Sequence, residues 1–248
     1  MRDQTLPATS ELRPLALKRW NRTLRAASDD AHSISIYDAI GNDPWSGEGV
    51  TTKRISAVLR SLNGADVTVN INSPGGDMFE GLAIYNLLRE YSGNVTVKVL
   101  GLAASAASVI AMAGDEIRIA RSGFLNIHNG WVVAMGNRHD LQDMVSTLEP
   151  FDRAMAEIYA TRTGTELSAM QQLMDADTWL NGSAAVEQGF ADDLLAADAV
   201  REVPVAQALT QPHQPLAPEM TLAIAQFQQA ITEFRTAAVT SLRRLHHA

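Results

Sequence analysis

The sequence of 248 residues contains no cysteine, which excludes a disulfide-bonded scaffold, a thiol nucleophile and a metal site with thiolate ligands. It has no apolar run near the roughly 18–20 residues that a membrane-spanning helix needs. Its first residues lack the basic-then-apolar order of a secretory signal peptide. From these absences we expect a soluble, cytoplasmic protein with no membrane partner.

Basic residues are also scarce, since 20 Lys and Arg face 28 Asp and Glu, for a net charge of −8. This balance argues against nucleic acid as the main partner, because phosphate contacts need a basic surface. Hydrophobic residues make up 46% of the chain and charged residues 19%, which excludes a mainly disordered protein. The length suits one large α/β domain with appendages.

The residue pattern divides the chain into four segments: an amino-terminal arm (1–31), a compact domain (32–200), a linker (201–218) and a helical tail (219–248). The linker contains four prolines and has no strong periodicity, which is typical of an extended connection. In the tail, apolar residues recur every three or four positions and predict an amphipathic helix with a coiled-coil-like seam. These residues are Met220, Ile224, Phe227, Ile231, Phe234, Ala238, Leu242 and Leu245.

Within the compact domain, strand-like and helix-like patterns alternate. Strands are predicted at 33–40, 67–72, 95–100, 116–120 and 124–128, and helices at 51–62, 80–91, 103–113, 138–163, 166–174 and 183–188. Repeats of this length predict an α/β fold of parallel βαβ units with right-handed crossovers.

The predicted helix over 138–163 ends before Gly164, which can adopt the left-handed conformation of a helix cap. Its apolar stripe is formed by Met144, Leu148, Phe151, Met155 and Ile158. Such a stripe is too large to leave in water, so we expect it to contact another subunit, and a charge at Met155 or Phe151 to dissociate the assembly. The alternative is that the stripe packs only within its own subunit.

Two candidate elements follow predicted strands. After strand 67–72, Pro74 fixes one backbone angle, and Gly75 and Gly76 allow a turn whose N–H groups can face a ligand or an oxyanion. After strand 95–100, Ser105 falls near the first turn of a helix, where unpaired N–H groups and the helix dipole favour developing negative charge. Ser108, one turn later, fits a capping or packing residue better.

The third candidate is His128, which ends the apolar strand FLNIH, where a catalytic base can be held rigidly. An acid is needed to orient such a histidine. Asp175 and Asp177, in the segment MDADTWLNG, lie between a helix and a turn, and composition does not distinguish them.

Four separated segments occur in an informative order: INSPGGDMFEGLAIYNLL, GLAASAASVIAMAG, FLNIHNG and ATRTGTELSAMQQLMDADTWLNGSAAVEQGFAD. Together, over about residues 33–198, they resemble the proteolytic subunit of the Clp protease, ClpP. The resemblance implies that Ser105 is the nucleophile, His128 the general base and Asp177 the third member of a catalytic triad. It also implies that the N–H groups of Gly76 and Ala106 form an oxyanion hole.

By the same resemblance we expect a crotonase-like spiral of βαβ units, homo-oligomeric rings with enclosed sites, and peptide or protein substrates. The resemblance implies neither a metal nor an organic cofactor. The expected activity is that of a serine endopeptidase.

The sequence departs from the family pattern in three places. Asn129-Gly130-Trp131 follows His128 where the family has glutamine and proline, the arm does not resemble the family's axial-loop segment, and the linker and tail are additional. Such extensions resemble those of ClpP-like head maturation proteases of tailed phages. The hypothesis is therefore a protease that processes head proteins in the host cytoplasm or the assembling prohead, with its tail bound to a scaffold or capsid protein.

Three alternatives remain open from the sequence. The first is a housekeeping Clp proteolytic subunit, the second a crotonase-fold acyl-CoA enzyme, and the third a non-catalytic assembly protein. Covalent labelling by a fluorophosphonate, which needs an activated serine, separates the proteases from the last two.

Overall fold

A computed structural model describes residues 14–21, 23–26, 31–41, 49–196 and 200–202 of the chain. Their main sheet has the strand order β2-β3-β4-β5-β8, with β6 paired to β4 and β7 paired to β6. All these pairings are parallel except that of β6 with β7. The strands are β2 (Ser33–Ile36), β3 (Val67–Ser73), β4 (Val95–Ala104), β5 (Glu116–Ile119), β6 (Phe124–Ile127), β7 (Thr178–Asn181) and β8 (Asp193–Leu194). The predicted α/β fold with a mostly parallel sheet is confirmed.

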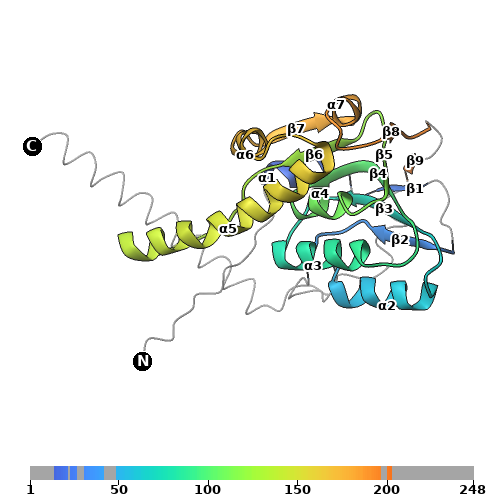
Figure 1. Ribbon diagram of the computed structural model, residues 1–248, viewed down its shortest axis with the longest axis horizontal. Coiled ribbons are helices and arrows are strands. Elements are labelled where there is room, and N and C mark those ends of the chain that lie inside the picture. Colours follow the sequence, from blue (N-terminus) through green and yellow to red (C-terminus); the bar gives the residue numbers. More distant parts are fainter. Residues whose placement is uncertain (1–13, 22, 27–30, 42–48, 197–199, 203–248) are drawn as a thin grey trace, which may run out of the picture. The chain divides into compact units, whose positions relative to one another are not determined.

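The helices that alternate with these strands are α2 (Thr52–Leu62), α3 (Met78–Arg89), α4 (Ala106–Ala111), α5 (Arg138–Thr163), α6 (Leu167–Asp175) and α7 (Gly182–Glu187). Helices α2, α3, α4 and α5 lie side by side along the sheet, each against the next (Figure 1). The core forms between the sheet and these helices, because every second residue of β3 and β4 turns an apolar side chain toward the helices. Val69 and Val97 are completely buried there.

Capping residues explain where the helices begin and end. The Asp77 carboxylate accepts the Glu80 N–H at 2.9 Å and starts α3. Asn137 and Asp140 form a capping box at the start of α5. At the other end of α5, Gly164 has φ +71°, so the predicted left-handed cap is confirmed.

The other side of the sheet carries part of the predicted amino-terminal arm. Helix α1 (Pro14–Arg19) and strand β1 (Leu24–Ala26) lie there, and β1 pairs antiparallel with β9 (Val200–Glu202). The Trp20 indole N–H donates to the Asn72 carbonyl oxygen at 2.8 Å. Ala16 is buried in a small cluster with Leu102 and Ala104. The sequence pattern of the arm, polar and interrupted by Pro7 and Pro14, favours weak structure, and that interpretation is wrong for this segment because its apolar residues cover the far side of β4.

One predicted boundary is wrong in a way that affects the candidate site. The helix expected from residue 103 begins only at Ala106, because β4 continues to Ala104. The small residues that favoured a helix instead extend the strand, where they pair with β6 in the register Leu102↔Phe124 to Ala104↔Asn126. Tertiary pairing thus overrides the helix propensity of alanine.

The apolar stripe of α5 packs differently from the expectation of a subunit contact. Met155 is only 4% exposed and belongs to the subunit core, and the Phe151 ring packs edge-on against Phe79 with centroids 5.0 Å apart. Met155 therefore packs within its own subunit, and Phe151 contacts Phe79 of the same subunit while it stays partly exposed. The exposed apolar side chains of α5 are Leu141 and Val145, in its first turns.

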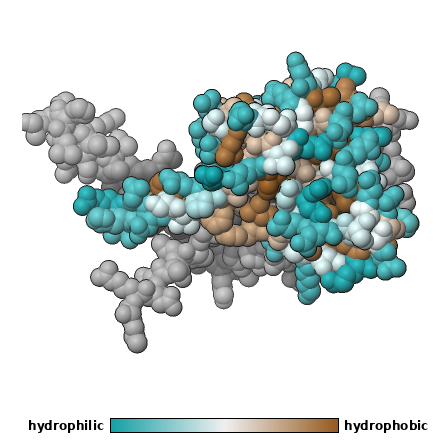
Figure 2. Space-filling model, viewed as in Figure 1, coloured by the Kyte–Doolittle hydropathy of each residue, from teal (hydrophilic) through white to brown (hydrophobic). Residues whose placement is uncertain are grey.

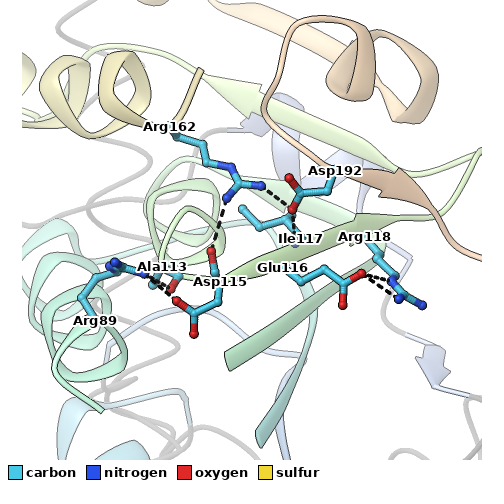
Figure 3. Close-up of polar contacts among 9 residues, drawn as sticks. Arg89, Ala113, Asp115, Glu116, Ile117, Arg118, Arg162 and Asp192 are labelled. Atoms are coloured by element: carbon cyan, nitrogen blue, oxygen red, sulfur yellow. Dashed lines mark hydrogen bonds and ion pairs between the residues drawn. The ribbon is translucent and has the colours of Figure 1, made fainter. Parts of the chain in front are cut away.

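Figure 1 shows that the first turns of α5 extend past the sheet, and Figure 2 shows that this end is mostly hydrophilic. The last turn of α5 is held by charge pairing. Arg162 binds Asp192, and the Asp192 carboxylate also accepts the Ile117 N–H of β5 at 2.7 Å (Figure 3). Nearby, Arg89 of α3 pairs with Asp115 at 3.1 Å. These contacts fix α5 and α3 to the end of the sheet opposite the predicted nucleophile.

The chain divides into two compact units, residues 1–208 and 209–248. The predicted tail helix and nearly all of the predicted linker lie outside the described residues. Among the helices that the structure describes, none combines the length and hydrophobicity needed to cross a bilayer.

Candidate functional site

Ser105 occupies a sharp turn between β4 and α4. Its backbone has φ +56° and ψ −129°, a region that non-glycine residues rarely adopt and that costs about 1–3 kcal/mol. Two backbone hydrogen bonds hold the turn, since the Ser105 N–H donates to the Asn126 carbonyl at 2.9 Å and the Ser108 N–H donates to the Ser105 carbonyl at 2.8 Å. Ser105 is half-buried and Ser108 completely buried, so Ser105 is the accessible hydroxyl of the two.

The Gly75-Gly76 turn lies directly against the Ser105 turn. A Cβ atom built on Gly75 would stand 2.7 Å from the Ser105 Cβ and 3.2 Å from the Ala106 nitrogen, so only glycine allows this approach. The Ile40 N–H donates to the Gly75 carbonyl, and the Asp77 N–H donates to the Ile40 carbonyl. These two bonds tie the residues on either side of Gly76 to Ile40.

The register of β6 and β7 relates His128 to Asp177. The antiparallel pairs run from Phe124↔Asn181 to Ile127↔Thr178. His128 directly follows β6 and Asp177 directly precedes β7, so the two residues flank the last pair of this register. Since β4 pairs with the other edge of β6, the chain segments that carry Ser105, His128 and Asp177 meet at one corner of the sheet.

His128 is 5% exposed, and its ring has a defined polar contact. The Nδ1 atom lies 2.5 Å from the Asn129 carbonyl oxygen. A carbonyl oxygen only accepts hydrogen bonds, so Nδ1 carries the proton and donates it. In the neutral ring this leaves the lone pair on Nε2, which is the form that a general base needs.

The two candidate aspartates differ in their surroundings. Asp177 is half-buried, has φ +52°, and accepts the Asn126 side-chain N–H at 2.8 Å. Asp175 is exposed and accepts the side-chain N–H of Asn129 at 2.7 Å. The structure thus brings Asp177 to the strand that bears the histidine and Asp175 to the loop that follows it.

Two polar contacts at the site were missed by reasoning from the sequence. Asn126 is buried, and the sequence already indicates an unusual position, because a polar residue lies inside the apolar strand FLNIH. The hydroxyls of Ser108 and Tyr159 lie 2.8 Å apart in the core. No local sequence pattern indicates that the Tyr159 hydroxyl is hydrogen-bonded. Burial raises the pKa of the Tyr159 phenol far above its usual range, and the Ser108 hydrogen bond opposes this only in part.

A pocket of about 660 Å³ opens beside the loop that follows His128. Its lining is rich in carboxylates and comprises Asn129, Ser146, Glu149, Pro150, Asp152, Arg153, Gln171 and Asp175. Burial raises the pKa of the Asp152 carboxyl, the hydrogen bond from the Gly130 N–H lowers it, and the carboxylates of Asp175 and Glu149 raise it. Among the described residues, no three His, Asp or Glu side chains are grouped so as to hold a metal ion.

Comparison with known families shows which family most of the domain resembles. The sequence model of the Clp protease family matches residues 47–198, more than half of the chain. This match contains the Gly75-Gly76 turn, Ser105, His128 and Asp177.

Individual relatives agree with this match. The chain is 31% identical to an ATP-dependent Clp protease proteolytic subunit of Bacteroides fragilis over 136 residues, which cover 53% of this chain and 65% of that one. With the corresponding subunit of Bacteroides thetaiotaomicron it shares 30% identity over 182 residues, covering 70% and 82% of the two chains. The chain thus spans less than two thirds of the length of the Bacteroides fragilis subunit.

Among solved structures, the fold is similar to that of a ClpP1 point mutant from Listeria monocytogenes, with a TM-score of 0.57 and 20% identity. The superposition covers 68% of this chain and 94% of that one. At this identity the likeness shows a shared fold.

Proposed function

The chain belongs to the Clp protease family, and from this premise we propose that it is a serine endopeptidase in which Ser105, His128 and Asp177 act as a catalytic triad. The observation that carries the proposal is the register of β4, β6 and β7, whose ends adjoin at the three residues. The strained Ser105 turn gives further support, because such conformations cluster at functional sites.

The proposed chemistry is acyl transfer. The Ser105 oxygen attacks the peptide carbonyl carbon while His128 Nε2 takes the serine proton, and a C–O bond forms. The C–N bond then breaks, and the leaving amine takes that proton from His128. Water attacks the acyl-enzyme with the same base, which releases the carboxylic acid and restores the serine.

The proposed oxyanion hole consists of the N–H groups of Gly76 and Ala106. Support comes from the approach of Gly75 to the Ser105 turn, which brings the glycine backbone next to the Ala106 nitrogen. Each such donor contributes about 3–4 kcal/mol to lowering the barrier. A side chain at Gly75 would therefore separate the two donors.

Fluorophosphonate labelling of the full chain tests the nucleophile. We expect one covalent adduct on Ser105, and no adduct and no peptide cleavage for Ser105→Ala. Ser108→Ala is the matched control, which should still label although it loses about 1–3 kcal/mol of stability, because the buried Tyr159 hydroxyl loses a partner. Cleavage by Ser105→Ala at a substantial fraction of the parental rate would overturn the assignment.

We further propose that the substrates are phage head or scaffold proteins, processed in the host cytoplasm or the assembling prohead. The support is the additional linker and tail, which housekeeping subunits lack. The proposed working form is a homo-oligomeric ring, supported by the exposed Leu141 and Val145 on α5. Mass spectrometry of products from candidate capsid and scaffold proteins tests the substrate class, and cleavage of unrelated unfolded proteins alone would favour a housekeeping subunit.

A further inference from the structure

Asn126 is a polar side chain in the middle of a buried strand. It is 1% exposed and lies on β6, between β4 on one side and β7 on the other. Burial of an amide is costly unless its donors and acceptors are bonded. An apolar residue would fill this position at less cost, so the amide needs another explanation.

The contacts of Asn126 reach two of the three proposed triad residues. Its side-chain nitrogen donates to the Asp177 carboxylate at 2.8 Å and to the Thr178 carbonyl at 3.1 Å. Both partners are pure acceptors, so the NH₂ group must face them. Its backbone carbonyl accepts the Ser105 N–H at 2.9 Å and the Ser108 hydroxyl at 3.1 Å.

The strand geometry relates these contacts to the histidine. Asn126 lies on β6, and His128 is the first residue after that strand. Asp177 is the residue before β7, whose first residue pairs with the last residue of β6. The Asn126 amide therefore holds one oxygen of a carboxylate that lies at the end of β6 from which His128 follows.

We propose that Asn126 is a positioning residue for Asp177. This inference rests on the proposed function. The amide holds one carboxylate oxygen to β6 and so keeps the carboxylate where it stabilises the imidazolium that forms when His128 takes the serine proton. Because Asp177 has a short side chain and a left-handed backbone, its hydrogen bond to the rigid strand restrains how the carboxylate rotates. The side chain thereby acts on Asp177, and the backbone carbonyl acts separately on the Ser105 turn.

The test uses the full chain with Asn126→Leu, which keeps the approximate volume and removes the donor. A hydrogen bond to a charged group is lost, so the maximal rate of fluorophosphonate acylation should fall about 10- to 100-fold. The probe concentration that gives half of that rate should change less than about threefold, because Asn126 does not face the probe. The matched control is Asn72→Leu, another buried asparagine whose amide donates only to backbone carbonyls, at Asn21 and Leu24. It should lower the melting temperature without lowering the acylation rate.

A double-mutant cycle separates positioning from structural support. If Asn126 acts through Asp177, Asn126→Leu should slow acylation less than about threefold further in an Asp177→Asn background. Additive losses would overturn the proposal. Should Asn126→Leu fail to fold, Asn126→Asp keeps the shape and sets a second carboxylate against Asp177, and a parental acylation rate in that variant would also overturn it. Absence of labelling in the parent chain would instead refute the proposed function.

Discussion

Backbone strain in the described residues is concentrated at the proposed site. Three non-glycine residues of the described part have positive φ, and two of them are Ser105 and Asp177. The third, Asn63, caps α2, where a left-handed asparagine is common. Ser105 occupies the N-cap position of α4 without a side-chain capping bond, and Asp177 follows the C-cap of α6, where its N–H donates to the Met174 carbonyl at 3.0 Å. Surrounding contacts hold both conformations, among them the Asn126 bonds to both residues.

The two aspartates give a ranked prediction. Asp177→Asn should lower kcat for a peptide substrate about 10⁴-fold, because a carboxamide does not stabilise the imidazolium that forms when His128 takes the serine proton. Asp175→Asn should change kcat less than about threefold, since its carboxamide oxygen still accepts the Asn129 N–H. Steady-state kinetics on both variants checks this, and the reverse ranking would transfer the third triad role to Asp175.

Asp152 gives a pH-dependent prediction. Burial holds the pKa of its carboxyl above the unfolded value, so ionisation weakens folding as pH rises from the unfolded-state pKa through the folded-state pKa. Asp152→Asn removes the charge but keeps an acceptor for the Gly130 N–H. We therefore expect a modestly higher melting temperature than the parent at pH 7.

The gain in melting temperature of Asp152→Asn should disappear below about pH 4, where the Asp152 carboxyl is protonated in both the folded and the unfolded state. Asp143→Asn, an exposed aspartate on the same helix, is the control and should leave the pH dependence of the melting temperature unchanged. Thermal scans from pH 3 to 8 make the comparison, and an Asp152→Asn gain that persists at pH 3 would contradict this explanation.

At the scale of elements, α5 has two distinct parts. Its second half is part of the core through Met155, Ala156 and Tyr159, whereas Leu141 and Val145 in its first half are exposed. The first half therefore adds little to the stability of one subunit. Its apolar side chains are available to a second copy.

This division predicts different outcomes for a charge in each half. Val145→Asp should dissociate the proposed ring and leave the subunit folded, because no core contact is lost. Met155→Asp should destabilise the subunit by about 4 kcal/mol, since it buries an unpaired charge. Sedimentation velocity with circular dichroism distinguishes the two, and a folded Val145→Asp variant that sediments as the parent assembly would exclude this half of α5 from the interface.

At the scale of the whole molecule, periodicity predicted most of the fold. The bounds of α5 match the prediction at both ends, because a capping asparagine and a glycine mark them locally. The start of α4 does not match the prediction, because β4 is extended by pairing with β6, a strand more than twenty residues later. Local pattern carries no information about such pairing.

The candidate site shows the same limit. The glycine turn, Ser105 and His128 each have a local signal at the end of a strand, and the family resemblance linked them. The preference for Asp177 over Asp175 depended on resemblance alone, because the β6–β7 register that distinguishes them is set by contacts between distant segments. Asn126 was readable as a polar residue in an apolar strand, but its partners were not.

The division of the chain at residue 208 decides how the role of the tail is tested. A cut after Val200 would remove two of the three residues of β9, which pairs with β1 and so fastens the amino-terminal segment. A cut after Ala208 preserves that pairing and removes the second compact unit. The chain 1–208 should keep its melting temperature within about 3 °C and its fluorophosphonate labelling rate within about twofold, because the proposed triad and its supporting strands are intact.

The helix predicted for the tail would need a partner surface for its apolar seam, since a solitary amphipathic helix of this length is marginally stable in water. If that partner is a scaffold or capsid protein, the chain 1–208 should lose co-sedimentation with the assembling particle while its peptide cleavage continues. Replacing Phe227 and Phe234 by serine in the full chain should have the same effect, because both residues lie on the seam. If either change instead abolishes labelling or unfolds the domain, the tail supports its own subunit and recruitment through the tail is refuted.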